Sequence, residues 1–272
     1  MRENIRKTVI QIIVVFAVVC ASVLPTAAHT GKTVSASCTC MSRRPQRFAA
    51  YVGDRNSAVP VSDRLMQRIR RAVREHAPYA DVSDLNIYIP SDQLDSYTLD
   101  ISSAIPPRCP DIICLDPGNT VSIDIDYISN KKQKFHLTKV YVRYVIRKKI
   151  DKREQKQLRK AVRNIAKKAR KKKGKRAQIK YVNDLLVKRI TYGDGTRHYS
   201  DAFGALVQRR ALCTGYARAF ALVMNELGIE NAFESTSDHI WNRVRIGRSW
   251  KIVDVTWNEG THSDRYLLKD TH

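Results

Sequence analysis

The stretch ALCTGYARAFALVMNELGIE, residues 211–230, decides how this 272-residue chain is expected to fold. Its apolar side chains recur at helical spacing, so the stretch predicts a helix that begins near Cys213. Gly228 follows the last apolar position, and glycine is a typical residue at the end of a helix. The sequence therefore places one cysteine in the first turn of a helix.

A hairpin of two strands is expected downstream, in DHIWNRVRIGRSWKIVDVTWNE, residues 238–259. If the loop around Gly247 has an even residue count, Trp241 pairs with Asp254 in the middle of the second strand. His239 then shares a face with Asp254 and comes within reach of its carboxylate. A loop with an odd count would place the two side chains on opposite faces.

Three of these residues together have the chemistry of a cysteine nucleophile site. The N-terminus of a helix favours the thiolate of Cys213, because unsatisfied backbone N–H groups and the helix dipole stabilise negative charge. His239 is the candidate general acid and base, and Asp254 is the candidate acceptor that orients its imidazole. The pattern alone leaves open a buried structural cysteine, a surface histidine and an aspartate that serves only the hairpin.

The order of the motifs resembles the transglutaminase-like superfamily of papain-type cysteine enzymes, in its secreted bacterial form. The resemblance covers residues 151–270 and rests on Cys-Thr-Gly-Tyr-Ala from Cys213, His-Ile-Trp-Asn from His239, and Trp-x-x-x-Asp-x-Thr-Trp from Trp250. It implies that Cys213 is the nucleophile and His239 the general acid/base. It also implies that Asp254 is the carboxylate that orients His239.

Acyl transfer is the reaction that this resemblance implies. The thiolate would attack a glutamine carboxamide or a peptide carbonyl and form a thioester, with the backbone N–H of Cys213 as one oxyanion donor and no second donor identified. Attack by an amine would then give an isopeptide cross-link, whereas attack by water would make the protein a protease or amidase. The resemblance implies no metal and no other cofactor, and Trp241 and Tyr216 are interpreted as packing residues.

The N-terminal residues 1–28 predict a secretory signal peptide, because basic residues precede an uncharged apolar run and small residues follow it up to Ala28. A retained signal anchor is the alternative, since the apolar run is long for a signal peptide. A lipoprotein modified at Cys20 fits less well, because Val19 stands where a small residue is expected. We therefore expect a secreted or surface-held protein.

The cysteine count leaves one thiol without a partner. If Cys20 is removed with the signal, five cysteines remain: Cys38, Cys40, Cys109, Cys114 and Cys213. Cys109 and Cys114 are close enough in sequence to bridge, and Cys38 and Cys40 could pair with each other, with these two, or with another chain. A four-thiol zinc site is the alternative, although neither spacing is the usual two-residue knuckle. We expect Cys213 to stay unpaired because it is the nucleophile.

Positive charge is concentrated in residues 131–190, which hold 25 Lys and Arg against three acidic residues, while the other 212 residues are nearly neutral. Residues 151–173 predict an amphipathic helix with a narrow apolar stripe and a basic face that ends at Gly174. A solvated face is the simplest interpretation, but such a cluster also attracts anionic cell-wall polymer or a lipid surface. Sequence-specific nucleic-acid binding is not expected, because no aromatic residue interleaves with the basic run from Asp151 to Arg176.

The fold class expected for the whole chain is α+β. Residues 29–59 would form an N-terminal segment, 60–148 a smaller α+β block, and 149–272 a papain-like or transglutaminase-like catalytic domain. In this domain the helix bearing the cysteine would pack on an antiparallel sheet bearing the histidine and the aspartate. In the smaller block the hydrophobic patterns predict one helix and three strands, over 61–76, 85–89, 120–128 and 135–146.

The leading hypothesis is a secreted or envelope-associated cysteine acyl-transfer enzyme that acts on protein or peptide amides through a thioester. The rival hypothesis is a catalytically silent transglutaminase-like fold that serves as a basic binding module for anionic polymers of the cell envelope. Thiol reactivity distinguishes the two, because only the enzyme needs a thiolate at Cys213. The sequence makes no prediction of the oligomeric state.

Overall fold

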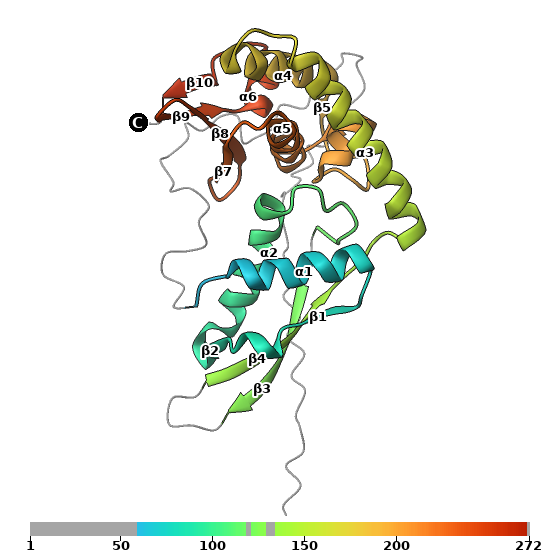
Figure 1. Cartoon of the computed structure of the whole chain (residues 1–272), viewed down its shortest axis with the longest axis vertical. Coiled ribbons are helices and arrows are strands. Elements are labelled where there is room, and N and C mark those ends of the chain that lie inside the picture. Colours follow the sequence, from blue (N-terminus) through green and yellow to red (C-terminus); the bar gives the residue numbers. More distant parts are fainter. Residues whose placement is uncertain (1–58, 118–120, 129–133, 271–272) are drawn as a thin grey trace, which may run out of the picture.

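The computed structural model describes residues 59–117, 121–128 and 134–270, and Figure 1 shows them as two blocks joined by a long helix. One hydrophobic cluster is built from residues between 65 and 146. A second lies almost entirely between 158 and 255, although it includes Ile113, and a small third cluster contains Ala217, Ala221 and Phe233. The predicted signal peptide, with Cys20, and the cysteines Cys38 and Cys40 lie outside the described residues.

The N-terminal block is organised around β4, Lys134–Val142, which is the central strand of an antiparallel sheet. Two short strands, β1 at Tyr79–Asp81 and β2 at Tyr88–Pro90, pair with one edge of β4 in succession. The longer β3, Val121–Ile128, pairs with its other edge. The four strands therefore form one sheet, in which β1, β2 and β3 all pair with β4.

Helix α1, Asp63–Glu75, packs on this sheet through buried Leu65, Ile69 and Val73. It begins where the Ser62 hydroxyl accepts a hydrogen bond from the backbone N–H of Leu65, at 3.2 Å, and it ends at His76, which has a left-handed conformation. The helix predicted over 61–76 is therefore confirmed. Its last turn fixes the position of the His76 side chain.

Helix α2, Leu94–Arg108, was not predicted from the sequence. Its last turns contain Pro106 and Pro107, and two adjacent prolines are more typical of a loop than of a helix. The strand predicted over 85–89 is also shorter than expected, because the 3₁₀ turns η2, Ser83–Leu85, and η3, Ser91–Gln93, flank β2. Directly after α2, Cys109 and Cys114 are free, buried thiols. The bridge that their spacing allowed is not formed.

The C-terminal block packs helices on a four-stranded antiparallel sheet with the strand order β10-β9-β8-β7. The strands span Asn231–Ser235 (β7), Ile240–Ile246 (β8), Ser249–Val253 (β9) and Leu267–Asp270 (β10). Helix α5, Cys213–Leu227, lies between this sheet and two further helices, α3 at Lys148–Ala169 and α4 at Lys175–Arg189 (Figure 1). The predicted arrangement, in which the cysteine helix packs on the antiparallel sheet, is observed.

The basic helix is displaced toward the N-terminus relative to the predicted 151–173, because α3 starts at Lys148 and ends at Ala169. Gly174, with a φ of 87°, separates it from α4. Helix α5 ends as predicted, at Gly228 with a φ of 70°. No helix among the described residues combines the length and the apolar character that a membrane span requires.

The segment between α4 and α5 is more ordered than its turn-rich sequence suggested. A short parallel pair joins β5, Thr191–Tyr192, to β6, Arg210–Ala211, and a π-helical turn covers Gly204–Gln208. Gly204 is required there, because a Cβ atom would lie 2.0 Å from the carbonyl oxygen of His198. This segment leads the chain directly into the first turn of α5.

Arg218 connects the two blocks from within α5. Its side chain is 7% exposed and donates hydrogen bonds to the backbone carbonyls of Pro110, Ile112 and Ser200. Burial lowers the pKa of this guanidinium, and nearby Asp201 and Asp111 oppose that effect. The loop after α2 is therefore held against the same helix that carries Cys213.

Candidate active site

Cys213 is the first residue of α5, and its side chain is partly exposed. The residue before the helix, Leu212, is extended and supplies no capping side chain. The positive end of the helix is therefore not neutralised by a capping side chain at Leu212. This placement agrees with the prediction from the sequence.

The first turn of α5 is fixed in place by close packing at Gly215. A Cβ atom there would lie 2.6 Å from the Cβ of Ala211 and 3.0 Å from the carbonyl oxygen of Asp201. The backbone N–H of Leu212 also donates to the carbonyl of Tyr199, at 2.7 Å. Only glycine allows this approach, so the Gly of the Cys-Thr-Gly motif has a steric role.

His239 and Asp254 form a buried hydrogen-bonded pair. Nε2 of His239 lies 2.7 Å from Oδ2 of Asp254, and the residues are 5% and 3% exposed. The hairpin register explains the contact, because Arg245 pairs with Trp250 and Arg243 with Ile252, as an even loop requires. The predicted meeting of these two side chains is observed.

Asp254 does not lie in the middle of a strand, which corrects the prediction. Strand β9 ends at Val253, and Asp254 is the N-cap of α6, Val255–Thr261. Its Oδ1 accepts a hydrogen bond from the backbone N–H of Trp257 at 3.0 Å, while Oδ2 contacts His239. One carboxylate therefore caps a helix and orients the imidazole at the same time.

Helix α6 is itself anchored, so the carboxylate has a fixed position. Asn258 donates from its side chain to Oδ1 of Asn183 in α4, at 2.9 Å, and accepts from the backbone N–H of Tyr266, at 2.8 Å. The backbone N–H of Asp254 donates to the carbonyl of Tyr266. These bonds hold the end of β9 against α4 and the strand that follows.

The imidazole of His239 is held in a state that favours its protonated form. Burial of the ring lowers its pKa, but the hydrogen bond with Asp254 and the proximity of Cys213 outweigh that effect and raise the pKa of His239 to about 10. Because Nε2 contacts Asp254, Nδ1 is the nitrogen that remains for proton exchange with the thiol. Nδ1 has no nitrogen or oxygen partner among the described residues.

Two tryptophans enclose the His239 ring. The rings of Trp257 and His239 stack with centroids 5.1 Å apart and an interplanar angle of 11°, and Trp241 stacks at 5.6 Å and 23°. Stacking on both neighbours limits rotation of the imidazole and excludes water from it. The prediction that Trp241 packs around the site agrees with this geometry.

Trp241 is held in turn by Glu234 of β7, a residue that the sequence analysis missed. Its indole Nε1 donates to Glu234 Oε2 at 3.1 Å, and Arg243 donates to Oε1 of the same carboxylate, also at 3.1 Å. Strand β7 has no clear sequence signal, but Glu234 occupies the position opposite Trp241 in the register. Tyr216, by contrast, is fully buried, donates its hydroxyl to the carbonyl of Ile190, and serves packing.

The geometry brings together all three residues that the sequence singled out. Cys213 comes from a helix N-terminus, His239 directly precedes β8, and Asp254 directly follows β9. With a partly exposed thiol, a buried imidazole and a carboxylate behind it, the site can form a thiolate and exchange a proton with a bound substrate. No metal ion is needed for such a step.

Comparisons with known proteins concern mainly the C-terminal block. A model described as the transglutaminase-like superfamily matches residues 159–255. A peptide-N(4)-(N-acetyl-beta-glucosaminyl)asparagine amidase from Caenorhabditis briggsae is 35% identical over 71 residues. The match covers 26% of this chain but only 12% of that relative's length.

Two solved structures are similar over about half of the chain. One is described as a TGase, with 18% identity, a TM-score of 0.33, and coverage of 50% of this chain and 43% of that chain. The other is a candidate cysteine protease from Cytophaga hutchinsonii, with 14% identity, a TM-score of 0.33, and coverage of 53% of this chain and 63% of that chain.

Proposed function

We propose that this chain, which belongs to the transglutaminase-like superfamily through residues 159–255, is a cysteine acyl-transfer enzyme acting on protein or peptide amides. The observation that carries the proposal is the buried pair of His239 and Asp254, 2.7 Å apart, with the Cys213 thiol interacting with the same imidazole. A cysteine with only a structural role would not require a neighbouring imidazole whose Nε2 is held by a carboxylate. The three residues are the nucleophile, the general acid/base and the orienting carboxylate.

The first chemical step is attack of the Cys213 thiolate on an amide carbonyl. Sγ forms a bond to the carbonyl carbon, and the carbonyl oxygen becomes an oxyanion beside the N-terminal N–H groups of α5. The C–N bond then breaks, the leaving ammonia or amine takes the proton from Nδ1 of His239, and a thioester remains on Cys213. Asp254 keeps the ring oriented throughout, because its carboxylate stays on Nε2.

The second step transfers the acyl group from the thioester to an acceptor. Neutral His239 removes a proton from water or from an amine, which attacks the thioester carbon and releases the Cys213 thiolate. Water as the acceptor makes the protein an amidase or a protease, and a lysine amine makes it a cross-linking enzyme. The name of the amidase relative supports an amide as the bond that is attacked.

An activated acyl ester tests the proposal without knowledge of the natural substrate. We expect p-nitrophenyl acetate to add one acetyl group to Cys213, detected by intact mass and peptide mapping, in the wild-type chain and in the Cys109→Ser control. The Cys213→Ala variant should remain unmodified at this site. An absence of acyl-enzyme in the wild-type chain would contradict the proposal and favour a binding module without catalysis.

Competition between acceptors identifies the fate of the thioester. We expect ammonia release from a glutamine-containing peptide, and we compare it with and without a lysine analogue such as cadaverine. Incorporation of the amine indicates a cross-linking enzyme, whereas ammonia release without incorporation indicates an amidase. Peptide-bond cleavage without ammonia release indicates a protease.

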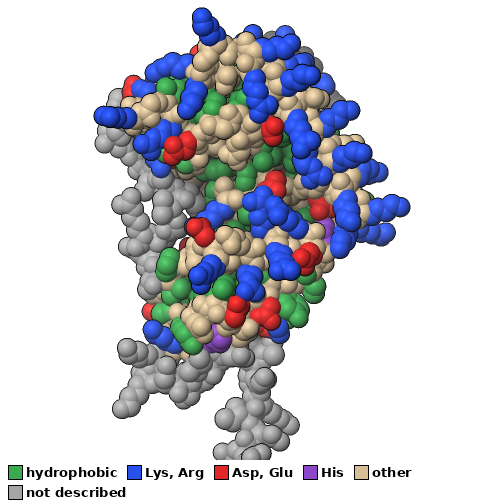
Figure 2. Space-filling model, viewed as in Figure 1, with side chains coloured by type: hydrophobic (Ala, Val, Ile, Leu, Met, Phe, Trp, Pro, Cys, Tyr) green, Lys and Arg blue, Asp and Glu red, His purple; other side chains and the backbone are tan. Residues whose placement is uncertain are grey.

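We also propose that the enzyme is held near an anionic surface by α3. Two of the three acidic residues within 131–190, Asp151 and Glu154, lie on the buried face of α3, while the Lys and Arg side chains of its outer face are exposed. Figure 2 shows these basic side chains gathered along the edge of the molecule that α3 forms. An outer face without exposed acidic residues favours contact with anionic lipid or cell-wall polymer.

A second positive region lies between the two blocks, in a cavity of about 370 Å³. Four arginines contribute to its lining, Arg70 and Arg108 from the N-terminal block and Arg159 and Arg163 from α3, and they outnumber the two acidic residues there, Asp111 and Glu226. The predicted signal peptide in residues 1–28 supports a location outside the cell or at its surface.

Salt dependence of binding to anionic vesicles tests this second proposal. We expect the triple variant Lys152→Gln, Lys156→Gln and Lys160→Gln to bind more weakly at low salt and to show a shallower salt dependence. The matched control removes the same charge from α1 through Arg64→Gln, Arg71→Gln and Arg74→Gln. Equal losses in both variants would indicate a response to net charge and would contradict a specific role of α3.

A further inference from the structure

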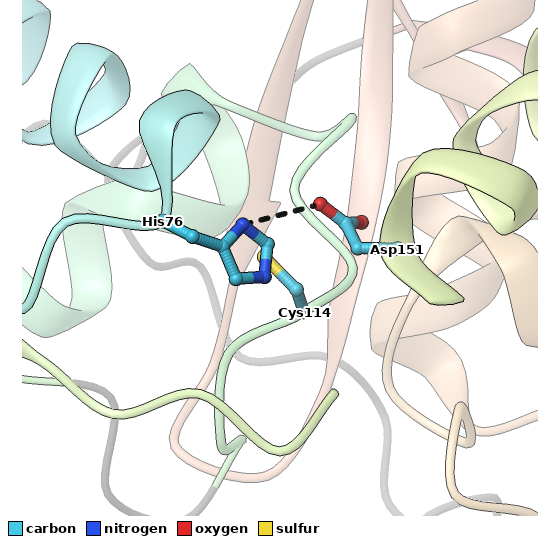
Figure 3. A group of neighbouring side chains, drawn as sticks. All are labelled: His76, Cys114 and Asp151. Carbon is cyan, nitrogen blue, oxygen red and sulfur yellow. Dashed lines mark ion pairs between the residues drawn. The ribbon is translucent and has the colours of Figure 1, made fainter. Parts of the chain in front are cut away.

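A second group of one cysteine, one histidine and one aspartate lies outside the candidate active site. It consists of His76 at the end of α1, Cys114 in the loop after α2, and Asp151 in the first turn of α3. One ligand atom from each residue lies within 4.8 Å of the other two. Figure 3 shows the three side chains pointing toward a common point between these elements.

The hydrogen bond of His76 determines which of its nitrogens faces the group. Nε2 lies 3.3 Å from the carbonyl oxygen of Ile146, and a carbonyl can only accept, so Nε2 carries the proton. The ring is also stacked on Tyr144, with centroids 4.5 Å apart and an interplanar angle of 14°. A histidine that binds a metal typically donates its second N–H to such a carbonyl, which leaves Nδ1 as the ligand.

Nδ1 of His76 faces a carboxylate at a distance that suits a shared ion better than a direct bond. It lies 3.8 Å from Oδ2 of Asp151, which exceeds the length of a hydrogen bond, and Nδ1 has no hydrogen-bond partner among the described residues. Asp151 is only 8% exposed, and its Oδ1 is also buried without a hydrogen-bond partner in the described part of the chain. Each of these two neighbouring residues therefore has a buried polar atom without a hydrogen-bond partner among the described residues.

Cys114 lacks the surroundings of a nucleophile. It is 1% exposed, and burial raises the pKa of its thiol, as does the neighbouring Asp151. Burial likewise raises the pKa of Asp151, although His76 opposes this effect. A bound cation reverses both tendencies, because it stabilises the thiolate and the carboxylate together.

We propose that His76, Cys114 and Asp151 bind one divalent metal ion, with Zn²⁺ as the best match to a nitrogen, a sulfur and an oxygen ligand. Binding releases the thiol proton of Cys114, and a water molecule completes the tetrahedral set. Ligand atoms around tetrahedral zinc lie about 3.3–3.8 Å apart, from bond lengths of about 2.0–2.3 Å. The 3.8 Å between Nδ1 of His76 and Oδ2 of Asp151 fits this range. The three ligand atoms lie within 4.8 Å of one another, so metal binding requires the most distant pair to approach by about 1 Å.

The site would join three segments that support the cysteine helix. His76 holds the end of α1, Asp151 holds the start of α3, and Cys114 lies in the loop whose Pro110 and Ile112 carbonyls accept hydrogen bonds from Arg218 of α5. The metal would therefore link the end of α1, the loop after α2 and the start of α3, and it is separate from the chemistry at Cys213. The site differs from the four-thiol site considered from the sequence, because it uses Cys114 without Cys109.

Cobalt absorption tests the site directly, because a thiolate bound to tetrahedral Co²⁺ gives a sulfur-to-cobalt charge-transfer band and intense visible d–d bands. The experiment uses the reduced mature chain, without a histidine tag, carrying Cys213→Ala so that the active-site thiol does not contribute. We expect both signals to saturate at one Co²⁺ per chain and to disappear when Zn²⁺ is added. No band at micromolar Co²⁺ in this folded chain overturns the proposal.

Matched variants assign the signal to residues. Cys114→Ser should lose the charge-transfer band, while Cys109→Ser, which alters a neighbouring buried thiol outside the group, should keep it. If Cys114→Ser does not fold, His76→Gln and Asp151→Asn keep the thiol and should weaken Co²⁺ binding by roughly 100-fold or more, since a ligand is lost and not only a supporting contact. A band that persists in Cys114→Ser, or that is lost equally in Cys109→Ser, contradicts the assignment.

Discussion

The molecule contains two groups of cysteine, histidine and aspartate, and their surroundings give them different chemistry. At the candidate active site, the carboxylate of Asp254 lies 2.7 Å from Nε2 of His239, and the thiol of Cys213 is partly exposed at a helix N-terminus. In the second group, Nε2 of His76 is bound to a backbone carbonyl, and Asp151 faces Nδ1 at 3.8 Å. The same residue types therefore favour proton transfer in one place and metal binding in the other.

The two groups differ first in the partner of the histidine nitrogen that points away from the cysteine: Asp254 for His239 and the Ile146 carbonyl for His76. A carboxylate on that nitrogen raises the basicity of the ring and supports a thiolate–imidazolium pair. A backbone carbonyl fixes the tautomer but adds no charge, so the free nitrogen remains a neutral ligand. Exposure of the thiol adds to the difference, because Cys213 is partly exposed whereas Cys114 is buried.

The largest expected effect is the loss of acyl transfer when Cys213 is removed from the candidate active site. Cys213→Ala should reduce the rate of turnover by about 10⁴-fold or more, because it removes the thiol that would form the thioester. Cys109→Ser should retain the wild-type rate. Steady-state release of ammonia or of p-nitrophenol measures this, and substantial turnover by Cys213→Ala would place the nucleophile elsewhere.

Asp254→Asn should have the next largest effect, because it disturbs both functions of one side chain. An amide cannot accept hydrogen bonds from the Trp257 N–H and from His239 through two oxygens, so either the helix cap or the imidazole loses its partner. We expect kcat to fall by about 10²–10⁴-fold and stability to fall by about 1 kcal/mol.

An exposed aspartate provides the control for this substitution. Asp264→Asn removes the same charge from a surface ion pair with Lys180 and should change neither quantity appreciably. Equal rates for Asp254→Asn and the wild type would show that the carboxylate does not orient His239.

Removal of bound metal should lower the stability of the fold, and this effect should depend on the group of His76, Cys114 and Asp151. With Zn²⁺ at 100 times its Kd, binding adds about 2.7 kcal/mol, so a chelator should lower Tm by roughly 5–10 °C for a chain of this size. Differential scanning calorimetry of the full chain with and without chelator measures the shift. The Cys114→Ser variant should show no shift, and an identical shift in that variant would mean that the metal binds elsewhere.

Gly215→Ala should distort the cysteine helix without changing any group that reacts. The added methyl group meets Ala211 and the Asp201 carbonyl, so we expect a loss of about 1–3 kcal/mol and weaker thioester formation. Gly195→Ala is the matched control, because its methyl would meet only the flexible side chain of Arg210, at 3.2 Å. Chemical denaturation of both variants measures the difference, and equal stabilities would contradict the close packing at Gly215.

The smallest expected effect is a change in how stability depends on pH. The folded-state pKa of His239 is raised to about 10, above the ordinary value of 6.5. The protonated ring therefore stabilises the fold fully below pH 6.5, and this contribution is lost as pH rises toward 10. We expect Tm of the wild type to fall by a few degrees across this window and Tm of His239→Gln to fall less, and parallel curves would contradict the raised pKa.

Much of the candidate active site could be predicted from local sequence. The helix start at Cys213 follows from apolar spacing, and the pairing of His239 with Asp254 follows from an even hairpin loop. The local structure at Asp254 was predicted wrongly, because flanking Val253 and Val255 suggested a continuous strand. An aspartate three residues before Trp257 is also a typical N-cap, and that signal was available.

The N-terminal block could be predicted only in part, because its local signals conflict with its tertiary structure. The prolines of α2 suggested a loop, although they lie in its last turns and buried Tyr97 and Ile101 hold the rest of the helix in place. The second group could not be predicted at all. His76, Cys114 and Asp151 lie far apart in the sequence, and no short spacing links them.

The most direct test of the central claim is the pH dependence of alkylation by iodoacetamide, with mass mapping of each thiol in the wild-type chain and in His239→Ala. We predict that Cys213 reacts well below the ordinary thiol pKa of about 8.5, that this low-pH reactivity is lost in His239→Ala, and that Cys114 stays unmodified in both. A Cys213 that is inert, or that reacts only as an ordinary thiol in both proteins, would contradict the thiolate–imidazolium pair.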